Sequence, residues 1–484
     1  MTQARSKHIS RKAIFSEHVL CDASQEAPSP MCIHIAGGNI ESVTPMSTKE
    51  FASLADKDDI DTLNLSSYLL TPTFTNAHTH LAMSAFRGLQ TNAFGGNVVE
   101  DLYYQIESKL TAEDVKAFAR FAAYEAILAG TGMVWDHYYF GASMAEGLAE
   151  AGLPAVIAPT LQDIHGPGVT TWEEQLQTTL ELNSHEWQTR GIWSAYGPHA
   201  TDTVSEALWV KVMQGAESLK LPIHVHVSQS PEEYERLMEK QGCSPIQFLS
   251  NIGVTALPIT KLLVHGLYAS AEDLDQLKNR DVVLGYCPYS QVQFGFPAPA
   301  DLWANQGLGV ALGTDCGASN DSMDVQQELR LAAGGYAFGV TRSEHVEHFY
   351  QSASTNGARE IDEFRKAKRE LHLQTMDKES LLSAVWDTPG HMHPSVRVGR
   401  LGAGYLANIA IWEQNHPALW PVGDVRRTLT MNQTAPALAG LILRGEQRGR
   451  IGDFQQSIMQ ETGFRESYIE AEARRSAFIG SLFP

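Results

Sequence analysis

The sequence predicts an α/β protein in which a (β/α)8 TIM barrel is joined to a small β-sandwich built from both chain ends. Apolar, strand-like segments alternate with helical segments eight times between residues 68 and 339. The strand-like segments are mainly apolar and lack the polar alternation of half-buried strands, as parallel strands buried on both faces do. Short β-like runs lie before and after this repeat, which indicates a second, smaller sheet region.

Each barrel unit is expected to pair one strand with one following helix. Strands are expected near residues 68–75, 132–138, 154–159, 192–199, 222–229, 260–266, 281–288 and 309–316. Helices are expected at 111–129, 141–152, 172–187, 203–219, 231–251, 270–279, 298–306 and 322–339. Thr111-Ala112-Glu113-Asp114 is typical of a capped helix start. In such a barrel, functional groups lie at the carboxyl ends of the strands.

The chain has 484 residues, which suits one barrel of roughly 250 to 350 residues plus an added module. We expect residues 1–67 and 391–452 to form the two parts of the β-sandwich around a barrel at 68–390. Further helices are expected at 343–385. Residues 453–484 are expected to form a helical tail that covers a surface or a partner subunit.

The composition indicates which class of protein and which kinds of partner are expected. Hydrophobic residues make up 43% and charged residues 19%, as in ordinary soluble proteins. The 36 basic and 56 acidic residues give 36 − 56 = −20, a net charge that repels nucleic acid. The start of the chain lacks the apolar run of a signal peptide, and no apolar segment is long enough to cross a membrane, so a cytoplasmic location is expected. Five scattered cysteines without a Cys-x-x-Cys pair are expected to be reduced thiols.

His78 and His80 end the first barrel strand, in Asn76-Ala77-His78-Thr79-His80-Leu81. Because side chains alternate along a strand, residues two apart project to the same side and can grip one metal ion. Later strand ends supply more groups of the same kind, namely His226, His265 and Asp315. Their convergence at one mouth of the barrel would place three imidazoles and one carboxylate together.

His78, His80, His226 and Asp315 are therefore the predicted ligands of one divalent ion with a position left open for water. Such an ion lowers the pKa of its water from about 15.7 towards about 7. We expect Asp315 to take the proton of that water and His265 to hold the water or the developing oxyanion. A two-metal site would require a bridging Lys on the strand at 192–199, which has none.

Three other groups near the strand ends are assigned to simpler roles. His224 points away from His226 in an extended strand, so it is expected to be a packed histidine behind the site. Asp136 and His137 follow the second strand, where contact with substrate is one interpretation and solvation in a loop is the preferred one. Aromatic residues near the strand ends are core residues or surface for a flat ring, namely Trp135, Tyr138, Tyr139, Phe140, Tyr286 and Phe294.

These motifs together resemble the amidohydrolase superfamily. The likeness is carried by Asn-Ala-His-Thr-His-Leu at 76–81, Gly-Pro-His at 197–199, His-Val-His-Val-Ser at 224–228, Leu-Val-His-Gly at 263–266 and Leu-Gly-Thr-Asp-Cys-Gly at 312–317. It runs from about residue 68 to residue 335. The most similar branch contains methylthioadenosine/S-adenosylhomocysteine deaminases, guanine deaminases and triazine hydrolases.

The resemblance implies an enzyme that uses one Zn²⁺ or Fe²⁺, with Zn²⁺ preferred, to hydrolyse an exocyclic substituent of a small nitrogen heterocycle. It implies that His199 contacts substrate and that Glu107 lies where the adenosine-type deaminases carry a Glu for ribose hydroxyls. A solvated Glu at a helix start is the alternative for Glu107. The resemblance also implies a homodimer.

Two positions depart from the family pattern. Family deaminases carry His-x-x-Glu on the fifth strand, where the Glu shuttles a proton, but here the segment is His226-Val227-Ser228-Gln229. Tyr286 stands where a His usually precedes Cys-Pro, and it is expected to face substrate. Losing a general acid typically lowers the rate by about 10²–10⁴-fold.

Four interpretations of Gln229 remain open at this point. Gln229 is an introduced change that traps substrate, or Tyr286 or His265 supplies the proton instead. Alternatively, the leaving group, such as chloride or a thiolate, needs no proton. The last interpretation is a homologue that binds its ligand and turns it over slowly or not at all.

Overall fold

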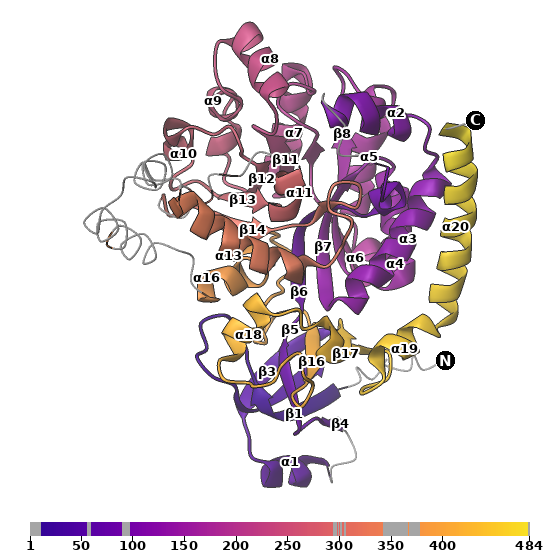
Figure 1. Cartoon of the computed structure of the whole chain (residues 1–484), viewed down its shortest axis with the longest axis vertical. Helices are drawn as coiled ribbons and strands as arrows, with labels where there is room; N and C mark the ends of the chain where they lie inside the picture. Colours follow the sequence, from indigo (N-terminus) through magenta and orange to yellow (C-terminus); the bar gives the residue numbers. More distant parts are fainter. Residues whose placement is uncertain are drawn as a thin grey trace, which may run out of the picture.

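Parallel strands surrounded by helices form the larger part of the molecule, and a second sheet lies beside them (Figure 1). The computed structural model describes residues 11–55, 60–89, 97–293, 306–341 and 378–482, together with Ala298, Ala300, Trp303 and Lys366. Phe294 and most of the helical segments expected at 298–306 and 343–385 lie outside these residues.

The parallel strands form a six-stranded sheet, in the order β10-β8-β7-β6-β15 with β9 beside β8, and a four-stranded sheet, in the order β11-β12-β13-β14. Parallel bridges from Tyr196 to Ile223 and from Ala200 to His226 link the two. β15 follows β14 in the chain and pairs with β6, so the chain leads from the end of the second sheet back to β6, in a TIM-barrel-like arrangement. The strands are β6 (Phe74–His80), β7 (Thr131–Tyr138), β8 (Ala155–Leu161), β9 (Ile192–Ser194), β10 (Gly197–Pro198), β11 (Ile223–Val227), β12 (Lys261–His265), β13 (Val282–Tyr286), β14 (Gly309–Leu312) and β15 (Asp315–Cys316).

The strand expected at 68–75 is two strands. Residues 68–72 form β5 (Tyr68–Pro72), which pairs with β1 and β16 of the other sheet, and only β6 joins the parallel strands. The change of sheet occurs at Thr73, whose N–H donates to Asn408 O over 3.4 Å, whereas the next N–H, from Phe74, donates to Gly130 O over 3.1 Å. One continuous apolar run therefore serves two sheets.

Helices cover the outer side of the parallel strands (Figure 1). The first long one, α3 (Ala112–Leu128), begins with the expected capping box between Thr111 and Asp114. The helices expected at 172–187 and 231–251 are each interrupted, and a serine caps the second piece of each, Ser184 in the first case and Ser244 in the second. The helices are α4 (Gly141–Ala151), α5 (Trp172–Leu182), α6 (His185–Thr189), α7 (Glu206–Leu219), α8 (Pro231–Gln241), α9 (Pro245–Asn251), α10 (Ala271–Gln276) and α13 (Val325–Thr341).

An insertion of short helices separates β6 from α3. It contains η1 (Leu81–Phe86), the π-helical η2 (Val99–Tyr103) and α2 (Tyr104–Glu107). The sequence pattern did not predict these turns. They carry Tyr104 and Glu107 towards the carboxyl ends of the strands, where both side chains line a cavity.

Both ends of the chain contribute strands to one eight-stranded sheet of order β18-β17-β16-β5-β1-β2-β3, with β4 beside β1. The joining of the two ends was predicted, whereas their division into the two faces of a sandwich stays a prediction. Trp412 of β16 donates from Nε1 to Thr71 Oγ1 of β5 over 2.9 Å, which ties the late strands to the early ones. The remaining strands are β1 (Arg11–Val19), β2 (Ser29–Ala36), β3 (Asn39–Pro45), β4 (Asp61–Asn64), β16 (Ile409–Glu413), β17 (Leu438–Leu443) and β18 (Glu446–Arg448).

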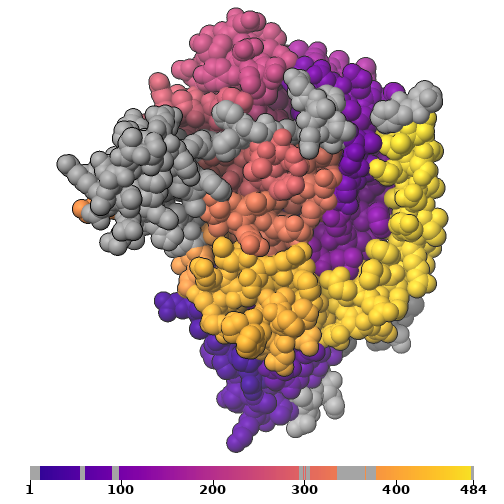
Figure 2. All heavy atoms as spheres, in the orientation of Figure 1, coloured from indigo at the N-terminus to yellow at the C-terminus, as the bar shows by residue number. Residues whose placement is uncertain are grey.

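The tail is helical, with α19 (Phe454–Met459) followed by the long α20 (Thr462–Leu482). In Figures 1 and 2, α20 forms a column along the flank of the molecule beside α3. Phe464 packs against Phe121 and Tyr124 of α3, and Arg474 pairs with Asp114 over 3.2 Å.

The state of the cysteines agrees with the expectation from their spacing in the sequence. The five cysteines are free thiols, and all except Cys21 are buried. Within the described residues, none of the helices is both long enough and apolar enough to cross a membrane.

Candidate active site

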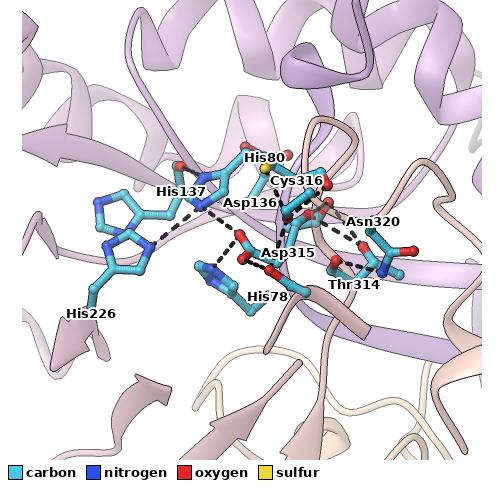
Figure 3. Close-up of polar contacts among 12 residues, drawn as sticks. His78, His80, Asp136, His137, His226, Thr314, Asp315, Cys316 and Asn320 are labelled. Atoms are coloured by element: carbon cyan, nitrogen blue, oxygen red, sulfur yellow. Dashed lines mark hydrogen bonds and ion pairs between the residues drawn. The ribbon is translucent and has the colours of Figure 1, made fainter. Parts of the chain in front are cut away.

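Strand pairing at the seam of the barrel-like sheet brings Asp315 between two histidines. His78 and His80 project from alternate positions of β6, and β15 pairs with β6 so that Asp315 lies opposite Thr79, the residue between them. Asp315 Oδ1 lies 3.6 Å from His78 Nε2 and 3.4 Å from His80 Nε2. Figure 3 shows the three side chains turned towards one another.

Two further strands complete the cluster. His226 of β11 places its Nε2 3.3 Å from His80 Nε2, and His265 of β12 faces His78 and Asp315. The ligand atoms of His78, His80 and His226 lie within 4.8 Å of one another, and so do those of His78, His265 and Asp315. The structure thus brings together all five residues that the strand ends predicted.

The histidine tautomers make this cluster fit a cation. His80 Nδ1 bonds to the main-chain oxygen of His137, and His226 Nδ1 bonds to that of His199 over 2.8 Å. A carbonyl only accepts, so both Nδ1 atoms carry the proton, and in the neutral rings both Nε2 atoms present a lone pair. Two lone pairs 3.3 Å apart and next to a carboxylate repel unless a positive ion lies among them. The donor set of imidazoles and a carboxylate fits a divalent cation.

His78 is held in the same way by the histidine behind it. His78 Nδ1 lies 2.7 Å from His224 Nε2, while His78 Nε2 is buried without a hydrogen bond among the described residues. His224 is therefore a packed, supporting histidine, as its strand position predicted. Support of a metal-binding ring through its other nitrogen fixes the direction of the lone pair.

Burial sets the protonation of these groups. Burial lowers the pKa of His78 to about 3 and that of His265 to about 4. Burial alone would raise the pKa of Asp315, but the facing His78, His265 and His80 outweigh it and hold that pKa well below its usual range. At neutral pH the cluster therefore has the deprotonated form that binding of a metal ion requires.

Two serines fix Asp315, and the sequence did not single them out. Ser290 Oγ donates to Asp315 Oδ2 over 2.6 Å, and Ser319 Oγ lies 2.8 Å from Ser290 Oγ. Asp315 therefore keeps Oδ1 turned to the histidines. The only sequence signal for Ser290 was its position just after Tyr286-Cys287-Pro288.

Two connected cavities open from the cluster. The inner cavity, of about 50 Å³, is lined by three of the cluster residues, His80, His226 and Asp315, and the outer cavity, of about 340 Å³, shares part of its wall. The residues that line both are Val99, Tyr104, His199 and Gln229. The inner cavity is lined in addition by His80, Met83, Tyr103, Glu107, His137, Tyr138, Tyr139, Thr160, His226, Asp315 and Cys316.

The structure places three of the four remaining predicted residues at these cavities. His199 and Gln229 stand where the cavities meet, and Glu107 lines the inner one. Glu107 is only 7% exposed, so the alternative of a solvated Glu is wrong, and burial raises its pKa to about 8. Tyr286 is not among the described residues lining either cavity, because its ring packs edge-on against Trp303.

Asp136 and His137 are not solvated loop residues, contrary to the expectation. β7 extends through both, and their exposed fractions are 0% and 1%. Asp136 Oδ2 accepts the N–H of Leu81 over 2.8 Å, which holds the turn after His80. The ring of His137 stacks on that of His226 at 4.9 Å and lines the inner cavity.

Comparison with known proteins agrees with this geometry. The family model described as "Amidohydrolase family" matches residues 69–361. A 5-methylthioadenosine/S-adenosylhomocysteine deaminase of Halobacterium salinarum is 30% identical over 87% of this chain and 90% of its own length.

Two solved structures share the fold. One is an adenosine deaminase from Xanthomonas campestris with bound zinc, at 20% identity and a TM-score of 0.79, which covers 97% of this chain and 99% of that one. The other is the atrazine chlorohydrolase TrzN from Arthrobacter aurescens complexed with zinc, at 17% identity and a TM-score of 0.75, which covers 97% and 100%. The family match spans more than half of the chain and includes the strand ends that carry the histidine and aspartate cluster, so this protein belongs to the amidohydrolase family.

Proposed function

We propose that this protein is a mononuclear, metal-dependent hydrolase that removes an exocyclic amino group from a small nitrogen heterocycle. The observation that carries the proposal is the convergence of His78, His80, His226 and Asp315, with the lone pairs of His80 and His226 facing each other at 3.3 Å. The names of the relatives, several of which are deaminases, support the reaction class. We propose Zn²⁺ as the ion, because solved neighbours of this fold hold zinc.

The proposed division of labour follows from the contacts. A divalent ion in this site would lower the pKa of a coordinated water to about 7 and so supply the nucleophile. Asp315 would accept the proton of that water, and the hydrogen bond from Ser290 to Oδ2 holds the carboxylate in place with Oδ1 turned to the histidines. The buried Nε2 of His265 has no hydrogen bond among the described residues and is free to bind the oxyanion.

The two cavities suggest how substrate lies. Tyr138 and Tyr139 line the inner cavity with aromatic surface, and at about 50 Å³ this cavity suits the reacting edge of a flat ring next to the cluster. Any group attached to that ring extends past His199 and Gln229 into the outer cavity. Glu107 on the inner wall is the residue we propose to bind substrate hydroxyl groups.

The test of the metal proposal combines metal analysis with one substitution. The purified protein should contain about one divalent ion per chain, and Asp315→Asn should abolish turnover of amino-heterocycles. Ser290→Ala is the matched variant: it keeps every predicted ligand and removes only the hydrogen bond to Oδ2, so it should retain the metal. Metal-free protein with full activity would refute the proposal.

Gln229 bears on which leaving group departs. The amide of Gln229 cannot give a proton to a departing amine, although its side chain lines both cavities, next to the place where the amine would leave. We expect Gln229→Glu to raise deamination by about 10²–10⁴-fold. Gln229→Met serves as the control, because it keeps the size of the side chain without an ionisable group.

The alternatives give different products in the same assay. If Gln229→Glu brings no gain but the wild type releases chloride or an alkylamine, the protein is a dechlorinating or alkylamine-releasing heterocycle hydrolase. Tight binding without turnover of any screened heterocycle, in both forms, would indicate a weakly active ligand-binding homologue.

We also propose a closed (β/α)8 barrel as the catalytic domain, with a second domain built from both chain ends and a cytoplasmic location. The parallel strands, with β15 paired to β6, support a barrel domain, and the single eight-stranded sheet supports the second domain. The net charge of −20 supports a small-molecule substrate rather than nucleic acid.

A further inference from the structure

Gln162 lies just past the end of β8 and stands behind the wall that both cavities share. Its side chain is fully buried. Both amide atoms make two contacts each: Oε1 accepts from Gly168 N over 3.0 Å and from Tyr139 Oη over 3.1 Å. Nε2 donates to Tyr104 Oη over 3.0 Å and faces His199 Nδ1 at 3.4 Å. All four hydrogen-bonding positions of the amide are therefore occupied.

The orientation of this amide is set by chemistry. The N–H of Gly168 only donates, so the atom of Gln162 that faces it must be the oxygen. The nitrogen then faces His199, and it has only hydrogens to offer. A flipped amide would place two donors against each other at Gly168, inside a site that excludes water.

This orientation dictates the tautomer of His199. Because Gln162 presents an N–H, His199 Nδ1 must accept, and the proton of the neutral ring lies on Nε2. The hydroxyl of Thr203, 2.9 Å from the same Nδ1, fits either tautomer, because it can donate to Nδ1 or donate to Ala200 O at 3.5 Å and accept from Nδ1, so the Gln162 amide is the contact that decides. The opposite tautomer would turn Nδ1–H against the amide N–H of Gln162. Burial lowers the pKa of His199 to about 3, so the ring is neutral.

The hydrogen bond from Gln162 to Tyr104 leaves the Tyr104 hydroxyl as a second donor on the wall between the two cavities. Tyr104 Oη accepts from Gln162, so its own hydrogen remains available on a side chain that lines both cavities. Burial holds the pKa of Tyr104 well above its usual range, which keeps that hydrogen in place. No hydrogen bond to His199 Nε2 is found among the described residues, and His199 lines the same two cavities.

We propose that Gln162 is a positioning residue that fixes His199 as the Nε2–H tautomer, so that the wall between the cavities selects substrates with a hydrogen-bond acceptor at that place. The acceptor would be a ring nitrogen or a carbonyl oxygen of the substrate. The selection of substrate rests on the proposed function, whereas the tautomer does not.

A glycine loop holds Gln162 in this position. Gly166, with φ of 111°, lies so close that a Cβ there would stand 2.4 Å from Gln162 Nε2. A Cβ on Gly168 would stand 3.0 Å from Gln162 Cβ. The loop thus packs directly on the amide, and any other side chain at Gly166 would displace it.

The direct test is ¹⁵N NMR of the histidine rings in the zinc-loaded protein without substrate, with His199 assigned by the signal lost in His199→Gln. We expect a protonated Nε2 and an unprotonated Nδ1 for His199. Gln162→Glu replaces the donor with an acceptor and should move the proton to Nδ1. Thr203→Val is the matched control, because it removes the hydroxyl and leaves Gln162 in place, and it should keep the wild-type tautomer.

An activity test adds the consequence for substrate. The wild type should prefer a heterocycle over its analogue with one ring nitrogen replaced by CH by at least about tenfold in kcat/KM. Gln162→Leu, which removes the donor without adding charge, should lose most of this preference through KM.

The outcomes separate the two proposals. A proton on His199 Nδ1 in the wild type, or a tautomer that changes in Thr203→Val but not in the Gln162 variants, overturns the role of Gln162. The expected NMR pattern without turnover of any heterocycle would support Gln162 and count against the proposed function alone.

Discussion

At both His80 and His226, a hydrogen bond from Nδ1 to a main-chain carbonyl fixes the direction of the lone pair on Nε2. Each ring gives its Nδ1 hydrogen to a carbonyl, from His137 in one case and from His199 in the other. The backbone of two neighbouring segments therefore orients the ligands before any ion arrives. Pre-orientation of this kind lowers the free energy needed to assemble a metal site.

Glu107 should make the stability of the protein depend on pH. Burial raises its pKa from 4.5 to about 8, so between these values the folded protein keeps a proton that the unfolded chain has lost. The stabilising contribution is complete below pH 4.5 and is lost as pH rises towards 8. Its slope is at most about 1.4 kcal/mol per pH unit.

Urea denaturation from pH 5 to pH 8 measures this effect. Glu107→Gln cannot titrate, so its free energy of unfolding should fall less steeply with pH than that of the wild type. The difference between the two proteins cancels the contribution of the other buried groups. Parallel curves for the two proteins would show that Glu107 is ionised throughout.

The convergence of the five cluster residues could be predicted because strand periodicity and barrel geometry both act on them. Two-residue spacing aligns His78 with His80, and the ends of parallel strands meet at one mouth. Ser290 and Gln162 could not be found in this way, since their partners, Asp315 and His199, come from distant segments. His137 was misread although the strand expected at 132–138 contained it, because the sequence pattern did not reveal that its ring is buried against that of His226.

Among the elements, β6 is the one on which the site depends, because it pairs with β7 on one side and with β15 on the other. The pairing with β15 is short and is reinforced by a side chain. Asn76 donates from Nδ2 to Thr314 Oγ1 over 2.8 Å and accepts the N–H of Thr314 at Oδ1 over 3.1 Å. These two hydrogen bonds reinforce the short pairing of β6 with β15, which a longer ladder of main-chain hydrogen bonds would otherwise hold together.

Asn76→Ala should therefore loosen the seam and lower the affinity for the metal ion. The change leaves the N–H of Thr314 buried without its acceptor, which destabilises the fold by about 1–3 kcal/mol. Chemical denaturation with and without added zinc measures both effects. Asn432→Ala, at the exposed end of α18 (Val425–Met431), is the control and should change neither. An unaltered zinc affinity in Asn76→Ala would separate the seam from the metal site.

Element boundaries were the part of the fold that sequence patterns predicted least well. The segment 68–75 was taken as one strand although Thr71, Pro72 and Thr73 lie at its middle, and the main-chain bonds of Thr73 and Phe74 show that the passage from one sheet to the other occurs there. The insertion that carries Tyr104 and Glu107 was missed because its turns are too short to show helical periodicity. In contrast, α3 was predicted closely, because a capping box marks its start.

For the whole molecule, the homodimer stays a prediction, and α20 is the place where it can be tested. Ile469 is a large apolar residue that is 67% exposed, and the neighbouring Tyr468, whose ring lies 5.5 Å from that of Phe121 in α3, is still 50% exposed. A second copy of the chain that covered them would remove this apolar surface from water. Sedimentation velocity should find a dimer at micromolar concentration, and Ile469→Glu should shift it to monomer, whereas the surface variant Glu466→Gln should not. A monomeric wild type would contradict the prediction.

The sheet shared by both chain ends has a consequence during translation on the ribosome. β5 emerges early, but its neighbour β16 lies near the end of the chain, so one edge of β5 lacks a hydrogen-bonding partner until synthesis is almost finished. A nascent strand whose edge is unpaired can form main-chain hydrogen bonds with strands of other chains. The parallel strands can form while this edge is still open, and the last strands, once released, complete the sheet against a core that has already folded.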